Sequence, residues 1–205
     1  IYQKLKLQTY KKLRKAIGKT FPELKQATKE LDAKSRKGFN IEGLALDASG
    51  ERLLIGLRGP VIDDDSVIII LNNPKELFDT DSKPVFFPEL VRLPLKKGGI
   101  RALSYVGSLK GYLIVTQRAK KENKSNKNFK LWFVKSLQDP EPVRLKLDGM
   151  DLRRVEGVSV IHNHGQKQIM LVSDDGNRVT DKPAQYLLLP VKRLLDNIIS
   201  VTLID

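Results

Sequence analysis

Six charged residues fall at matching places in three similar stretches of the chain, and their types could do chemistry. They are three carboxylates and three guanidinium groups: Glu42, Arg58, Arg101, Arg118, Glu156 and Asp175. Carboxylate oxygens are the ligands that hard divalent cations such as Ca²⁺ prefer, and guanidinium groups bind anions in bidentate fashion. The same groups can instead neutralise one another in ion pairs, which buried charges need. The residue types leave both hypotheses open, a ligand site and a set of structural ion pairs.

The elements that must position these residues form a repeat. An apolar run at residues 39–46, 98–105 and 153–160 is followed each time by a turn and a second apolar run, at residues 53–58, 113–118 and 170–175. The copies start 59 and then 55 residues apart. A period of about 40 to 60 residues filled with short strands is typical of the blades of a β-propeller.

Two further strand-like segments complete each repeat. The third segments are residues 67–71, 129–134 and 185–189, and the fourth are residues 91–95, 143–147 and 200–204. Four strands make one propeller blade. The sequence therefore predicts an all-β fold, a β-propeller fragment of three four-stranded antiparallel blades at residues 38–97, 98–152 and 153–205. The expected buried positions include Leu44, Leu54, Ile69, Leu103, Val115, Trp132, Val158 and Leu171.

The N-terminal part differs from the repeats. Residues 2–7 alternate basic residues and leucines as the fourth strands do, so we expect residues 1–9 to be an orphan strand, the last of a missing blade. Apolar residues at helical spacing predict a two-helix insertion in residues 10–37, with helices at about 10–18 and 21–34 and a capping box from Thr20 to Glu23. Three blades cannot close a ring. We expect the rest of a longer chain, or a second copy, to complete it, and Ile1 in place of Met favours the longer chain.

This architecture places the six charged residues at one rim. In each blade the first strand begins where the antiparallel second strand ends, which predicts that Glu42 lies opposite Arg58, Arg101 opposite Arg118, and Glu156 opposite Asp175. First strands line the central channel of a propeller. All six would then surround its mouth, either as salt bridges between neighbouring blades or as a site for an anionic small molecule and a cation.

The composition of the chain indicates which classes of binding partner to expect. The net charge of +13 invites a nucleic-acid partner, but the basic runs at 11–15, 34–37 and 120–128 carry no interleaved aromatic residues, so nucleic acid is not the expected ligand. No apolar run approaches the ~20 residues of a membrane span, so we expect no membrane partner. Cysteine is absent, which excludes disulfides and thiolate metal sites. Nothing in the sequence distinguishes a cytoplasmic from an extracytoplasmic location.

Short motifs in the repeats resemble a bacterial propeller family of unknown function. They are residues 40–45 (NIEGLA), 55–60 (IGLRGP), 99–103 (GIRAL), 155–158 (VEGV) and 173–176 (SDDG). The resemblance covers about residues 38–205 and includes Glu42, Arg58, Arg101, Glu156 and Asp175. The Glu-Gly pair is also distantly similar to esterase-like phytase and gluconolactonase propellers, in which axial carboxylates hold a divalent cation. That similarity implies Glu42 and Glu156 as metal ligands, although the leading blades of the family are missing here.

Two classes of function follow. The first is a ligand-binding or interaction module that acts through the polar mouth of the channel. The alternative is a metal-dependent hydrolase of a phosphate ester or lactone, which would use Lewis-acid polarisation and an activated water. The chain has no Gly-x-Ser-x-Gly elbow or phosphate loop, which counts against acyl and phosphoryl transfer by the familiar apparatus.

Overall fold

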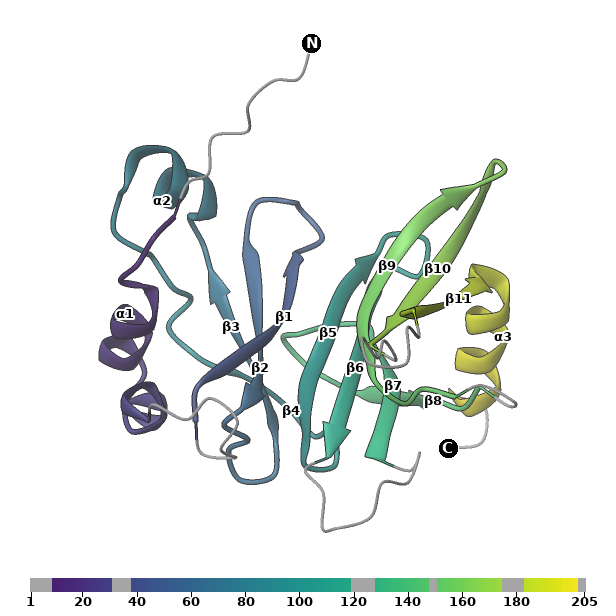
Figure 1. The fold of residues 1–205 in the computed structure, drawn as a ribbon, viewed down its shortest axis with the longest axis horizontal. Coiled ribbons are helices and arrows are strands. Elements are labelled where there is room, and N and C mark those ends of the chain that lie inside the picture. The colour runs from purple at the N-terminus through teal and green to yellow at the C-terminus, as the bar shows by residue number, and fades with distance from the viewer. Residues whose placement is uncertain (1–8, 31–37, 119–127, 148–150, 175–182, 203–205) are drawn as a thin grey trace.

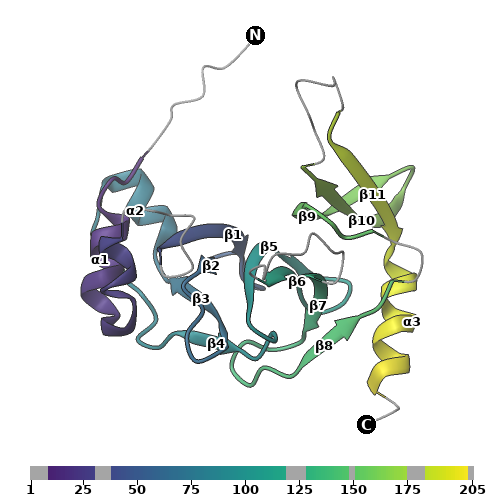
Figure 2. The same ribbon diagram turned by 60° about the horizontal axis from the view of Figure 1, so that its bottom comes forward.

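Three antiparallel sheets follow one another around an arc (Figures 1 and 2). The computed structural model describes residues 9–30, 38–118, 128–147, 151–174 and 183–202. The first sheet contains β1 (Asn40–Leu46), β2 (Leu53–Gly59), β3 (Ser66–Leu71) and β4 (Val91–Leu93), in that order. The second contains β5 (Gly98–Val106), β6 (Gly111–Arg118), β7 (Phe129–Val134) and β8 (Pro142–Leu145), and the third β9 (Val155–Asn163), β10 (Gln166–Ser173) and β11 (Gln185–Pro190). The predicted all-β propeller fragment is confirmed.

The first strand of each sheet, β1, β5 or β9, lies on the inner side of the arc (Figure 2). Each sheet packs face to face on the next through aliphatic and aromatic side chains. Between the first and second sheets the core contains Leu54, Ile68, Ile100, Ile114 and Trp132. Between the second and third sheets it contains Val115, Leu131, Phe133, Ile169 and Leu171. These two layers are the blade-to-blade contacts that the repeat predicts.

The outer face of the first sheet is covered by helical segments. The helix α1 (Leu13–Thr20), two single 3-10 turns (Pro22–Leu24 and Ala27–Lys29) and the helix α2 (Pro74–Thr80) pack here. Ile17, Phe21 and Leu24 are fully buried against strand residues such as Ile55 and Ile69. Helical segments therefore cover the outer face of the first sheet in the arc.

Only the first of the two predicted N-terminal helices is an α-helix. The capping box does not form, because the Thr20 hydroxyl donates back to the carbonyl of Ala16 at 3.0 Å. Phe21 is extended and Pro22 follows it, so the chain turns and continues in 3-10 geometry. The predicted orphan strand at residues 2–7, and the end of the predicted second helix, lie outside the described residues.

The third sheet differs from the prediction in its last element. Residues 200–202, expected in a fourth strand, belong to the helix α3 (Val191–Thr202), and residues 203–205 lie outside the described part. Val191, Leu194 and Ile198 recur at helical spacing and pack into the core between the second and third sheets. The Asn197 side chain also holds the Lys146 backbone, donating from Nδ2 to its carbonyl at 2.8 Å and accepting from its amide at 3.2 Å. Helix α3 thus covers the end of β8.

Six of the eight predicted core positions are buried: Leu54, Ile69, Leu103, Val115, Trp132 and Leu171. Val158 is half-buried. The prediction is wrong for Leu44, which is 59% exposed. Leu44 lies on β1, the edge strand of the first sheet. In the described part of the chain, no helix has the length and apolar character needed to span a membrane.

Candidate functional site

A β-bulge at the same place in each first strand carries the candidate residues. Ile41 pairs with Leu57 and Gly43 with Gly56, which leaves Glu42 as the extra residue. Arg101 is the extra residue in the second sheet, and Glu156 is the extra residue in the third. A bulge bends its strand and re-aims the unpaired side chain. The three sheets therefore present Glu, Arg and Glu from equivalent positions.

These side chains meet in one group, which we call the charged cluster: Glu42, Arg58, Arg101 and Glu156. Arg101 Nη1 lies 2.7 Å from Glu42 Oε2, and Arg101 Nη2 contacts Glu156 Oε1. Arg58 Nη1 lies 2.7 Å from Glu42 Oε1, which also accepts a hydrogen bond from Asn40 Nδ2 at 3.2 Å. A single arginine in the second sheet thus bridges a glutamate from the first and one from the third.

Arg101 is the most enclosed member of the cluster. Its side chain is 7% exposed, whereas that of Arg58 is 38% and that of Glu156 is 44% exposed. Burial lowers the pKa of the Arg101 guanidinium, and the negative charge of Glu42 opposes this shift. The Nε atom of Arg101 is buried and has no acceptor in the described part of the chain. Arg101 is therefore a buried cation with one donor still to be satisfied.

The structure confirms part of the predicted arrangement. Glu42 and Arg58 contact each other, and ion pairs tie neighbouring sheets together, as the structural hypothesis predicts. The pairing of Arg101 with Arg118 is wrong. Because β5 extends back to Gly98, Arg118 pairs with Gly98, beyond the bulge that holds Arg101. Asp175 lies outside the described residues.

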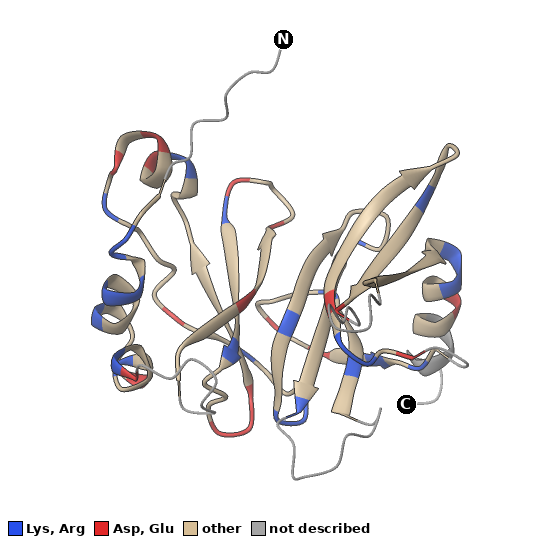
Figure 3. Cartoon of the chain, in the orientation of Figure 1, with Lys and Arg blue, Asp and Glu red and all other residues tan. Residues whose placement is uncertain are grey.

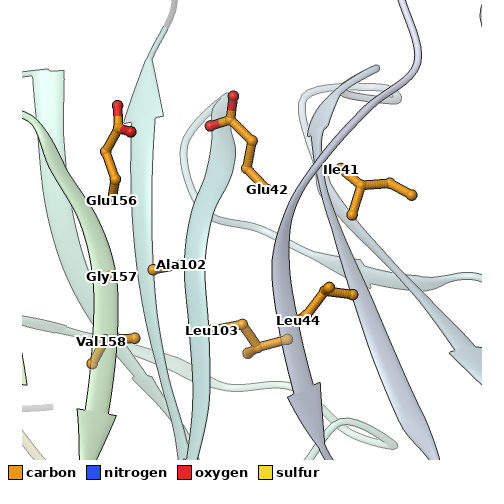
Figure 4. A pocket seen from close by; sticks show the side chains of 8 residues that line it. All are labelled: Ile41, Glu42, Leu44, Ala102, Leu103, Glu156, Gly157 and Val158. Atoms are coloured by element: carbon orange, nitrogen blue, oxygen red, sulfur yellow. The ribbon is translucent and has the colours of Figure 1, made fainter. Parts of the chain in front are cut away.

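A cavity of about 270 Å³ opens beside the charged cluster, between β1, β5 and β9 (Figure 4). Its lining residues are Ile41, Glu42, Leu44, Ala102, Leu103, Glu156, Gly157 and Val158. The two carboxylates lie at one end, and the side chains of Leu44, Leu103 and Val158 lie toward the other. The cavity therefore has two carboxylates at one end and an aliphatic wall toward the other, so a small ligand could contact both kinds of surface.

The cluster does not fit a divalent cation. Glu42 and Glu156 are the carboxylates expected to hold it, but the Arg101 guanidinium already bonds both and supplies the positive charge between them. Calcium takes six to eight oxygen ligands. No group of three histidine, cysteine or acidic side chains suited to a metal occurs within the described residues.

The N-terminal part of the chain is similar to a known protein family. Residues 4–81 are similar to the family described as "Protein of unknown function (DUF3616)". The matched segment includes α1, most of the first sheet, Glu42 and Arg58. No curated protein and no solved structure matched the chain. The similarity therefore extends to a family of unknown function and supplies no activity.

Proposed function

We propose that this chain is a ligand-binding module whose site is the cavity between β1, β5 and β9. The observation that carries the proposal is the pair of carboxylates, Glu42 and Glu156, fixed at one end of an aliphatic cavity by a shared arginine. Side chains locked by ion pairs are pre-organised, so a ligand does not have to order them on binding.

The bonding pattern favours a ligand that donates hydrogen bonds. Both oxygens of Glu42 are already used by Arg58 and Arg101. Glu156 uses Oε1 for Arg101, and its Oε2 has no partner among the described residues. Two arginines and two glutamates leave the charged cluster neutral. We therefore propose a small ligand with a hydroxyl or ammonium group that reaches Glu156 and an apolar part that lies along Leu103 and Val158.

An anionic ligand is the second candidate. It is favoured by the partial exposure of Arg58, whose guanidinium could pair with a carboxylate or phosphate oxygen. We do not propose a metal-dependent hydrolase, because the donor set around Glu42 and Glu156 does not suit the cation that this chemistry needs.

Ligand-observed NMR with three fragment sets, neutral polyols, primary amines and monocarboxylates, separates the candidates. Binding of polyols or amines that is lost in Glu156→Gln supports the donor ligand, and binding of carboxylates that is lost in Arg58→Gln supports the anion. The matched control is Glu76→Gln, an exposed glutamate on α2. If no fragment binds the wild type in a manner sensitive to Glu156 or Arg58, the proposal is wrong.

We also propose that another sheet covers the free face of the third sheet, supplied by the rest of a longer chain or by a second copy. Met170 pairs with Leu188 and Val172 with Tyr186, so these residues share the face opposite to the buried Leu171. Tyr186 is 69% exposed. The equivalent face of the second sheet is a buried core layer. Light scattering tests the second copy, since a stable monomer at all concentrations would exclude it.

A further inference from the structure

Four basic residues that do not belong to the charged cluster lie near one end of the second sheet. Lys130 pairs with Thr116, and Arg118 lies two residues beyond Thr116 on the same strand. Arg144 pairs with Trp132, which lies two residues beyond Lys130. Alternate residues of a strand share a face, so Arg118, Lys130 and Arg144 share one. Lys96 lies in the turn before Gly98, the partner of Arg118. Figure 3 shows basic positions near these ends of β6 and β7.

The central residue of this basic group is buried, and none of the described residues supplies it with a counter-charge. Lys130 is 8% exposed, and its ammonium lies 5.9 Å from the centroid of the Trp132 ring. Trp132 is itself held by a hydrogen bond from Nε1 to Thr116 Oγ1 at 2.9 Å. Lys130 has no acidic partner in the described part of the chain. Burial lowers the pKa of Lys130, and the positive charges of Arg144, Arg118 and Lys96 lower it further.

Asp64, which lies beside the turn that contains Lys96, and its neighbour Asp63 are paired with other cations. Asp63 lies 2.7 Å from Arg92 and Asp64 lies 2.7 Å from Lys97, which is the neighbour of Lys96 in the turn. Asp63 and Asp64 therefore neutralise Arg92 and Lys97, not the basic group. The three positive charges around the buried Lys130 repel its ammonium group, and a bound anion would relieve that repulsion.

We propose that Lys96, Arg118, Lys130 and Arg144 form a binding site for the phosphate group of a small molecule. A phosphate carries enough negative charge to offset several cations, and its oxygens accept hydrogen bonds from ammonium and guanidinium groups together. The Trp132 ring is buried and Lys130 lies over it, so this ring offers no surface on which a nucleic-acid base could stack. A small phosphate compound therefore fits better than a nucleic-acid strand.

The test is isothermal titration with inorganic pyrophosphate at constant ionic strength, set with sodium chloride. The variants are Lys130→Met, which keeps the apolar stem without the charge, and Arg144→Gln at an exposed position. Lys192→Gln, at an exposed position on α3, is the matched control. We expect each site variant to weaken pyrophosphate binding about tenfold or more and the control to stay within about twofold.

Thermal melts of the same proteins show whether each variant folds, and Arg144→Gln keeps the test informative if Lys130→Met does not. Equal weakening by Lys192→Gln would show general charge screening and overturn the site, as would the absence of pyrophosphate binding to the wild type. A short oligothymidylate is the second probe. If it binds more tightly than pyrophosphate and is lost in the site variants, the assignment to a small phosphate compound is wrong.

Discussion

Glu42 and Arg101 belong to adjacent sheets, and Arg101 Nη1 lies 2.7 Å from Glu42 Oε2. Both are the extra residues of equivalent bulges in β1 and β5. Because Arg101 also contacts Glu156 on β9, the inner strands of all three sheets are joined through one side chain. The charged cluster thus fixes the spacing of the strands that line the cavity.

We predict that Arg101→Met destabilises the fold by about 3 kcal/mol. Removal of one partner from a buried ion pair typically costs about 3 to 5 kcal/mol, and the lower end applies because Glu42 keeps Arg58 and Glu156 is partly exposed. Arg58→Ala, at a more exposed position, should cost about 1 kcal/mol or less. Urea denaturation of both variants measures the difference. Equal losses from the two variants would contradict the central role of Arg101.

Gly43→Ala and Gly157→Ala should behave differently although they follow equivalent glutamates. A Cβ at Gly43 would lie 2.8 Å from Ile100 Cγ2 of the neighbouring sheet, whereas a Cβ at Gly157 would lie 3.5 Å from Val172 Cβ in ordinary contact. Overpacking of a core costs about 1 to 3 kcal/mol. We expect a loss of this size for Gly43→Ala and a change below about 0.5 kcal/mol for Gly157→Ala. Thermal melts suffice, and a large loss for Gly157→Ala would indicate a sheet packed on the third.

Asp47 should make stability depend on pH in acid. Burial raises its pKa, but hydrogen bonds from Ser49 and Arg52 outweigh this and lower the pKa to about 2. A carboxyl whose pKa is lower in the folded than in the unfolded state stabilises the fold above its unfolded pKa near 4. That contribution is lost as the pH falls from about 4 toward about 2.

Asp47→Asn should therefore reduce the free energy of unfolding at neutral pH by about 1 to 3 kcal/mol and flatten its decline below pH 5. Denaturant titrations across this range provide the measurement. Glu51→Gln, at a neighbouring exposed position, is the control and should leave the slope unchanged. An unaltered slope in Asp47→Asn would refute the assignment.

We predict that calcium does not stabilise the protein through Glu42 and Glu156. A ligand that binds the folded state at about 100 times its Kd adds about 2.7 kcal/mol, which a thermal melt detects readily. Melts with added CaCl₂ and with a chelator should coincide, because Arg101 takes the place between the carboxylates. A rise in Tm with calcium that disappears in Glu42→Gln and Glu156→Gln would show that a cation displaces the arginine.

The repeat pattern predicts the sheets well because each strand carries its own alternation and its own turn. It does not predict α3, because Ser200–Thr202 are β-branched or small and match a strand locally. The helix is stabilised by the packing of Val191 and Ile198 in the core and by the bonds of Asn197 to Lys146. Those contacts depend on the position of β8, which local sequence does not contain.

Only those contacts of the charged cluster that are local in sequence could be predicted in detail. The contact of Glu42 with Arg58 follows from hairpin pairing, which is local. The bridge from Arg101 to Glu156 joins residues in different sheets, so it follows from the repeat only as a general expectation of ties between blades. The predicted partner of Arg118 is wrong because the pairing register depends on where β5 begins, which the sequence does not show.

At each bulge, the extra residue has no partner in the strand pairing of its sheet. Glu42, Arg101 and Glu156 are each flanked by paired neighbours, and a bulge of one residue forms in all three strands whether the extra residue is an acid or a base. The bulge therefore brings a side chain to the rim without itself requiring that side chain to be an acid or a base. A scaffold of this kind can acquire a new binding preference one residue at a time.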